Sequence, residues 1–136
     1  MEPAGTFKLK LTDFKTAVNS FEKSLLLDLN HYKGVELDTI KSGQIQKFEY
    51  CIELCWKTLK LYLNDKHSLD SVSPKDTIKK FFGINLIDEN DYELLIQMLD
   101  DRNRLSHIYN EMFFDEIHSR LKNYLKVLKK ITNKLK

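Results

Sequence analysis

Apolar residues that recur in alternating steps of three and four are the feature that most constrains this fold. The last such stretch is the most regular and runs through Ile117, Leu121, Tyr124, Leu128, Ile131 and Leu135. This spacing is typical of a helix whose buried seam packs along a near-antiparallel neighbour. Similar steps within residues 12–32, 45–63 and 92–99 predict three further long helices. We therefore predict an all-α fold, an up-and-down four-helix bundle.

Turn-forming and capping residues set the expected helix ends. Gly34 is expected to end the first helix, and the polar residues 64–68 are expected to form a loop. Ser73, which precedes a proline, predicts the start of one extra short helix, and Gly83 predicts its end. Asp88 is expected to cap the third long helix. The short helix then lies on the connection between the second and third members of the bundle.

Length and composition predict one domain over residues 1–136, of which residues 1–6 form a flexible N-terminal extension. The apolar content of 42% suffices for one core, and two prolines and four glycines leave little room for the turns that join strands. With 22 basic and 20 acidic residues, the net charge of +2 gives no general nucleic-acid footprint. Any anion-binding site must therefore be local.

Neither a secretion signal nor a membrane span is predicted. No apolar run follows a basic start, and an apolar stretch such as Leu25–Leu27 is far too short to cross a bilayer. We therefore expect a cytoplasmic protein with no membrane partner. Cys51 and Cys55 lie one helical turn apart on an apolar face without further ligands nearby, which favours buried thiols over a metal site.

Polar and titratable side chains concentrate between residues 101 and 111, where the third long helix gives way to the fourth. Arg102, Ser106 and Tyr109 share one helical face, and Asn103 and His107 lie on a neighbouring stripe. Arg102 and His107 point away from each other on an ideal helix. They meet on one substrate only if the helix unwinds near His107 or if a second copy supplies the other half, so we expect a twofold homodimer.

These side chains suit chemistry on nucleotides without a metal. The guanidinium of Arg102 can hold a phosphate, and the imidazole of His107 can take the proton from a ribose 2′-hydroxyl. Arg102 and His107 are therefore the candidate catalytic residues. The candidate residues for binding a nucleotide or RNA are Arg102, Asn103, Ser106, His107 and Tyr109.

Three motifs follow one another along the chain. Residues 46–60 carry a Phe-Glu pair and then Glu-x-x-Trp-Lys, and residues 73–87 lead through a glycine into an apolar pair. The third motif consists of Arg102, four further residues, His107, one more residue and Tyr109. In this order the motifs resemble those of HEPN domains, in particular the nucleotidyltransferase substrate-binding protein family. The resemblance covers most of the chain and implies a HEPN-like helical bundle.

The resemblance implies two roles that share a site and a partner. Many HEPN domains are metal-independent ribonuclease toxins that act as dimers, and a minimal nucleotidyltransferase partner can silence them by transferring AMP to the motif tyrosine, here Tyr109. In the other role, the helical protein catalyses nothing and binds the substrate for a separately encoded nucleotidyltransferase, which holds the magnesium. This chain lacks the Gly-Ser and paired aspartates on a strand that a transferase needs, so it is not the transferase.

We favour the nucleotide- and substrate-binding subunit of a toxin–antitoxin-like pair. The ribonuclease toxin is the alternative, and a non-catalytic dimeric structural adaptor is a second one. No intrinsic cofactor is expected, since ATP or AMP would be a ligand or would reach the chain through its partner. Two further features allow alternative interpretations. For Trp56 we favour packing in the core or at an interface over stacking with a base. For the C-terminal lysines we favour a solvated helix face over an RNA-binding surface.

Overall fold

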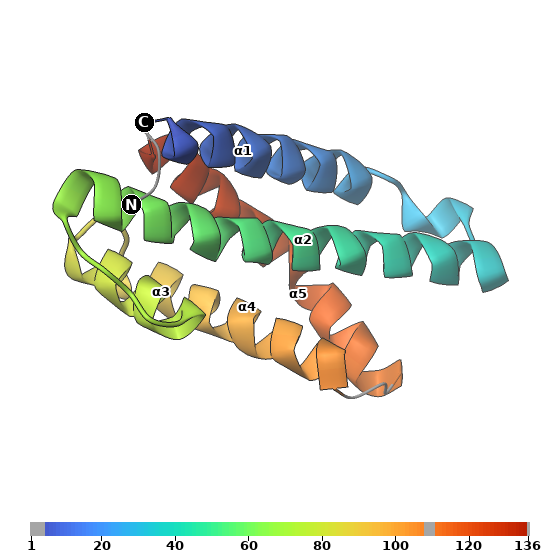
Figure 1. Ribbon diagram of the computed structural model, residues 1–136. Helices are drawn as coiled ribbons and strands as arrows, with labels where there is room; N and C mark the ends of the chain where they lie inside the picture. Colours follow the sequence, from blue (N-terminus) through green and yellow to red (C-terminus); the bar gives the residue numbers. More distant parts are fainter. Residues whose placement is uncertain (1–4, 108–110, 136) are drawn as a thin grey trace.

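The computed structural model describes residues 5–107 and 111–135, and every regular element in this part of the chain is helical. The four long helices are α1 (Thr6–Leu25), α2 (Gly34–His67), α4 (Glu89–His107) and α5 (Glu111–Lys134). They run alternately up and down, and the short α3 (Pro74–Gly83) lies on the connection between α2 and α4 (Figure 1). A single 3₁₀ turn, Leu29–His31, joins α1 to α2. The predicted all-α bundle with one extra short helix is therefore confirmed.

Helix α2 is the central element of the bundle. It has 34 residues, against 20 in α1, and it packs against α1, α3, α4 and α5. Its first turns lie at the same end of the bundle as the end of α4 and the start of α5 (Figure 1). None of the helices in the described residues is long and apolar enough to cross a membrane. Because α2 touches all the other helices, it can supply a wall to several surface hollows.

The observed helix ends correct several predictions. Helix α1 begins at Thr6, inside the extension expected over residues 1–6, and residues 1–4 lie outside the described part of the chain. Gly34 does not end the first helix but opens α2, with a φ of 62°. The expected loop at residues 64–68 is still helical up to His67. Residues 64–67 are exposed, and because apolar periodicity detects only the buried part of a helix, this last turn of α2 escaped it.

The capping predictions for α3 and α4 are largely confirmed. Ser73 Oγ accepts a hydrogen bond from the backbone N–H of Asp76 at 3.1 Å, and the Asp88 carboxylate accepts one from the N–H of Asp91 at 2.8 Å. Each bond satisfies a backbone donor that the first helical turn leaves free. Gly83, however, is the last residue of α3, and the left-handed position that follows is filled by Asn85, with a φ of 64°.

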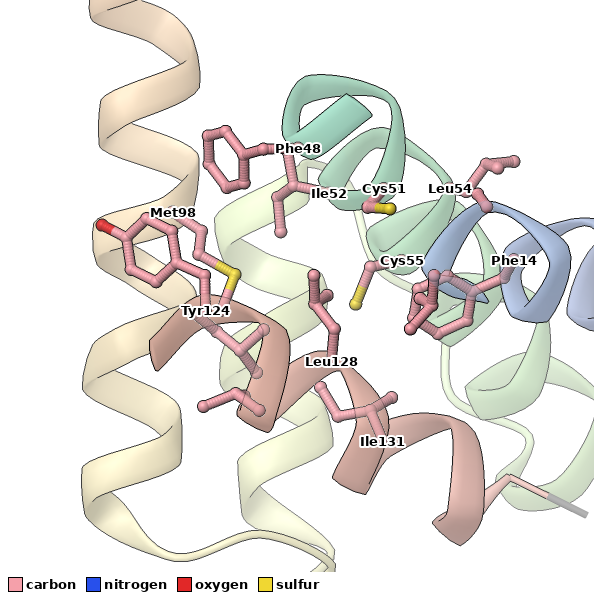
Figure 2. Packing of buried hydrophobic residues seen from close by; sticks show 14 of the residues in the cluster. Phe14, Phe48, Cys51, Ile52, Leu54, Cys55, Met98, Tyr124, Leu128 and Ile131 are labelled. Atoms are coloured by element: carbon pink, nitrogen blue, oxygen red, sulfur yellow. The ribbon is translucent and has the colours of Figure 1, made fainter. Parts of the chain in front are cut away.

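The core draws on all four long helices, and Figure 2 shows its centre. Phe48 of α2 stacks on Tyr124 of α5 with ring centroids 5.1 Å apart. Cys51 and Cys55 are fully buried in this apolar packing as free thiols. Burial raises the pKa of the Cys51 thiol to about 12, so it stays protonated at neutral pH. Both cysteines therefore behave as small apolar side chains.

Candidate functional site

An open hollow lies between the middle of α2 and the last turns of α4. Its volume is about 520 Å³, and its lining residues are Gln46, Glu49, Tyr50, Glu53, Arg102, Asn103, Ser106 and His107. Four of the predicted site residues thus meet in one place. The fifth, Tyr109, lies outside the described residues. The hollow between α2 and α4 is called the motif hollow below.

The motif hollow corrects one premise about Arg102 and His107. The two residues were expected to diverge, so that only local unwinding or a second copy would bring them to one substrate. In the structure α4 stays helical through His107, yet both residues line the motif hollow of a single chain. Because the hollow is open and extends along the helix, it can be lined by two residues that point in different directions from the helix axis. The homodimer stays a prediction, but the divergence of Arg102 and His107 no longer supports it.

Arg102 is held in place by a carboxylate that the sequence did not assign to it. Its Nη1 pairs with Glu53 Oε2 of α2, and its Nη2 donates to Asn103 Oδ1 at 3.0 Å. The Arg102 side chain is only 20% exposed. Glu53 also accepts a hydrogen bond from Trp56 Nε1 at 3.2 Å and lies 3.7 Å from Lys57 Nζ. The guanidinium therefore faces the hollow from a fixed position.

Glu49 adds a second carboxyl group to the motif hollow. Burial raises the pKa of this group above its ordinary value, and the charge of Arg102 offsets the rise only in part. Ser106 donates its hydroxyl to the backbone carbonyl of Arg102 at 3.2 Å, so its oxygen remains available as an acceptor. Asn103 and His107 are exposed. The motif hollow therefore mixes cationic, acidic and neutral polar groups.

Comparison with known proteins identifies the group to which the chain is related. Residues 9–136 match the family described as "Nucleotidyltransferase substrate binding protein like". The chain belongs to this family. A protein of Thermus thermophilus, known from its crystal structure, has the same fold with a TM-score of 0.80 and 28% sequence identity, over 90% of this chain and 98% of that one. No protein of curated function matches the chain.

A polar cluster lies on the face of α4 that points into the bundle. It was not predicted from the sequence of this member of the substrate binding protein-like family. Asp101 is 2% exposed, and Arg120 Nη1 of α5 donates to its two carboxylate oxygens at 2.9 and 3.0 Å. Tyr124 donates its hydroxyl to the same carboxylate at 2.5 Å. Burial, followed by this hydrogen bond, raises the pKa of Tyr124 well above its usual range. The cluster ties α4 to α5.

Other residues weighed from the sequence have structural surroundings. Trp56 is half-buried against the core and does not line the motif hollow, where Tyr50 is the aromatic side chain instead. Lys129 pairs with Glu22, and Lys130 lies 3.3 Å from Asp91. These contacts fit the solvated helix face that was favoured for the C-terminal lysines. No group of three or more metal-binding side chains occurs among the residues that the structure describes.

Proposed function

We propose that this chain is the nucleotide- and substrate-binding subunit of a separately encoded minimal nucleotidyltransferase, in a pair of the toxin–antitoxin type. The observation that carries the proposal is the presence of Arg102 and His107 on one open hollow, in a chain whose family is described by substrate binding. A guanidinium offers a planar pair of donors that matches phosphate oxygens. The subunit works as a homodimer in this proposal, because the HEPN domains that its motifs resemble act as dimers.

Binding of a phosphate at Arg102 begins with an exchange of anions. Glu53 pairs with the guanidinium of Arg102, so an incoming phosphate must displace this carboxylate or share the guanidinium with it. His107 and Asn103 lie on the same hollow, and each can donate a further hydrogen bond to the phosphate. The chain thus binds and orients the nucleotide. The partner would supply the metal carboxylates and the transfer chemistry.

Tryptophan fluorescence offers a direct test of phosphate binding. Trp56 is the only tryptophan and donates to Glu53, so movement of that carboxylate should change its emission. In an AMP titration followed by calorimetry, we expect Arg102→Ala to weaken binding by about 10- to 100-fold, because the phosphate loses the hydrogen bonds that a charged guanidinium donates to it. Equal affinity of AMP for Arg102→Ala and for the unmodified chain would contradict the proposal.

Arg104 provides a matched control for this titration. It lies on the same helix and carries the same charge, but its guanidinium stacks 3.7 Å over the ring of Phe113 and does not line the motif hollow. Arg104→Ala should therefore leave AMP affinity unchanged. A similar loss in both variants would mean that AMP senses only net charge, and it would contradict a site at Arg102.

Ribonuclease activity is the second candidate, favoured by the presence of His107 beside Arg102 on the motif hollow. In this role His107 takes the ribose proton and Arg102 stabilises the phosphate. AMP transfer to Tyr109 by the partner would then silence the chain. RNA cleavage by EDTA-treated protein that leaves a 2′,3′-cyclic phosphate and is lost on His107→Ala would replace the binding-only role with this one.

A further inference from the structure

A second hollow, of about 570 Å³, lies between α1 and α2 and adjoins the motif hollow. Small residues line much of it, namely Thr16, Ala17 and Ser20 of α1 and Gly43 of α2. A β-carbon added at Gly43 would meet no atom within 4 Å, so the space in front of this glycine is open. This α1–α2 hollow therefore has room for a flat group to approach the backbone.

Gln46 and Tyr50 line both hollows and form the wall that they share. They lie one turn apart on α2, and Glu53, the partner of Arg102, follows Tyr50 by three residues on the same side of the helix. From Gln46 to Glu53 the helix advances by about 10 Å, a length comparable to that of one nucleotide. The anion-binding end and the α1–α2 hollow are thus close enough for one ligand to span.

Tyr50 is an unusual surface residue in this chain. Its side chain is 60% exposed, whereas the other large aromatic rings in the described helices are buried or half-buried. An exposed phenol ring on the rim of an open hollow offers an apolar face at little conformational cost. Bases stack on such rings without needing a particular sequence, because every base has a π-face. Tyr50 is therefore placed to contact the base of a ligand whose phosphate is bound by Arg102.

We propose that the two hollows together bind one nucleoside monophosphate, with its phosphate at Arg102 and its base stacked on Tyr50 above the small side chains of the α1–α2 hollow. This inference rests on the proposed function and adds to the phosphate contact at Arg102 a place and a contacting residue for the base. Asp13 and Lys47 also line the α1–α2 hollow, and both can hydrogen-bond to base or ribose, Lys47 through the ammonium group that donates to Ser20 Oγ at 2.7 Å. Tyr50 is then a residue that selects for a base.

The test compares three ligands by isothermal titration calorimetry: AMP, ribose 5-phosphate and inorganic phosphate. Tyr50→Ala should weaken AMP binding by about 5- to 100-fold, the range typical of a lost base–aromatic stack, and leave the other two ligands unchanged. Tyr50→Phe keeps the ring and should bind AMP like the unmodified chain. Leu9→Ala removes another exposed apolar side chain, 72% exposed on α1, and should change nothing.

Gly43→Leu tests the α1–α2 hollow without touching Tyr50. A leucine side chain finds open space there and favours the helix, so the fold should be preserved while the hollow is filled. AMP binding should fall and phosphate binding should persist. Two results would overturn this inference while leaving the proposed function standing, provided that phosphate binding still needs Arg102. The first is that AMP binds no more tightly than ribose 5-phosphate, and the second is that Tyr50→Ala leaves AMP affinity unchanged. Absence of binding by all three ligands would contradict the proposed function as well.

Discussion

Two consecutive residues of α4, Asp101 and Arg102, form arginine–carboxylate pairs on different sides of the helix. Asp101 pairs with Arg120 of α5, and the Asp101 side chain is 2% exposed. Arg102 pairs with Glu53 of α2, whose side chain is 35% exposed and borders the motif hollow. The chemistry of the two pairs is the same. The two arginine side chains are similarly exposed, at 26% for Arg120 and 20% for Arg102, so the pairs differ in the burial of the acidic partner. That burial decides whether a pair holds helices together or can exchange its carboxylate for a ligand.

The position of the two pairs on α4 separates support from binding. Neighbouring residues on a helix point about 100° apart, so one helix can hold a structural contact inside and a binding group outside. The buried carboxylate of Asp101 is further satisfied by Tyr124, whose ring stacks on Phe48 of α2. The inner pair thus braces α4 against α5 and helps to keep Arg102 in position. The outer pair stays accessible to an incoming anion.

Arg120→Met should give the largest effect. It leaves the buried carboxylate of Asp101 with the Tyr124 hydroxyl but without its cation. Removal of one partner from a buried pair costs about 3–5 kcal/mol, so urea denaturation at pH 7 should show a loss of unfolding free energy in this range. Arg102→Met is the matched variant of the outer pair and should cost less than about 1 kcal/mol.

A further substitution identifies the cause of that loss. Asp101→Asn in the Arg120→Met background removes the orphaned charge and should recover part of the unfolding free energy. Equal losses for Arg120→Met and Arg102→Met would contradict the assignment of one pair to the framework and the other to the site. The free energies are comparable only if the slopes of the urea transitions agree.

Tyr124→Phe should have an intermediate effect. The substitution removes the 2.5 Å hydrogen bond to Asp101 but keeps the ring that stacks on Phe48. A hydrogen bond to a buried charged group contributes about 1.5–3 kcal/mol, and urea denaturation should show a loss at the lower end because Arg120 still binds the carboxylate. Tyr62→Phe, with a half-buried tyrosine that packs beside Phe7, is the control and should change little. A larger loss in the control would refute this account.

The sequence predicted the bundle better than it predicted either pair. Apolar spacing placed Tyr124 correctly on the buried seam of α5, because this spacing reflects burial directly. It could not reveal that the hydroxyl of Tyr124 meets Asp101, since that contact depends on how α4 and α5 cross. Glu53 entered the sequence analysis only as the glutamate of the Glu-x-x-Trp-Lys motif. Its pairing with Arg102 joins residues 49 positions apart, which local spacing does not encode.

The candidate site was predicted in composition but not in arrangement. The four candidates Arg102, Asn103, Ser106 and His107 all line the motif hollow, although Arg102 and His107 were expected to point away from each other. The wall that α2 contributes was missed, because spacing along α2 does not show which of its side chains, Glu49 and Tyr50 among them, face α4. Only the packing of α2 beside α4 shows that they face the same hollow as Arg102.

Glu53→Gln should have the smallest effect on stability and an opposite effect on binding. Glutamine keeps the size and hydrogen-bonding capacity of the side chain but removes the negative charge that competes with phosphate for Arg102. The unfolding free energy should fall by less than about 1 kcal/mol, because the pair is partly exposed and screened. AMP affinity should rise about two- to fivefold, since a ligand no longer displaces a carboxylate.

Glu22→Gln is the control for this change. Glu22 pairs with Lys129, and its side chain is 33% exposed, close to the 35% of Glu53, but it does not line the motif hollow. Both variants remove one carboxylate from a similar ion pair and alter the net charge equally, so a general charge effect would raise AMP affinity in both. Tighter binding in Glu53→Gln alone would support the exchange at Arg102. Weaker binding in Glu53→Gln would mean instead that Glu53 orients the guanidinium for phosphate, and the outer pair would then be part of the binding site rather than its competitor.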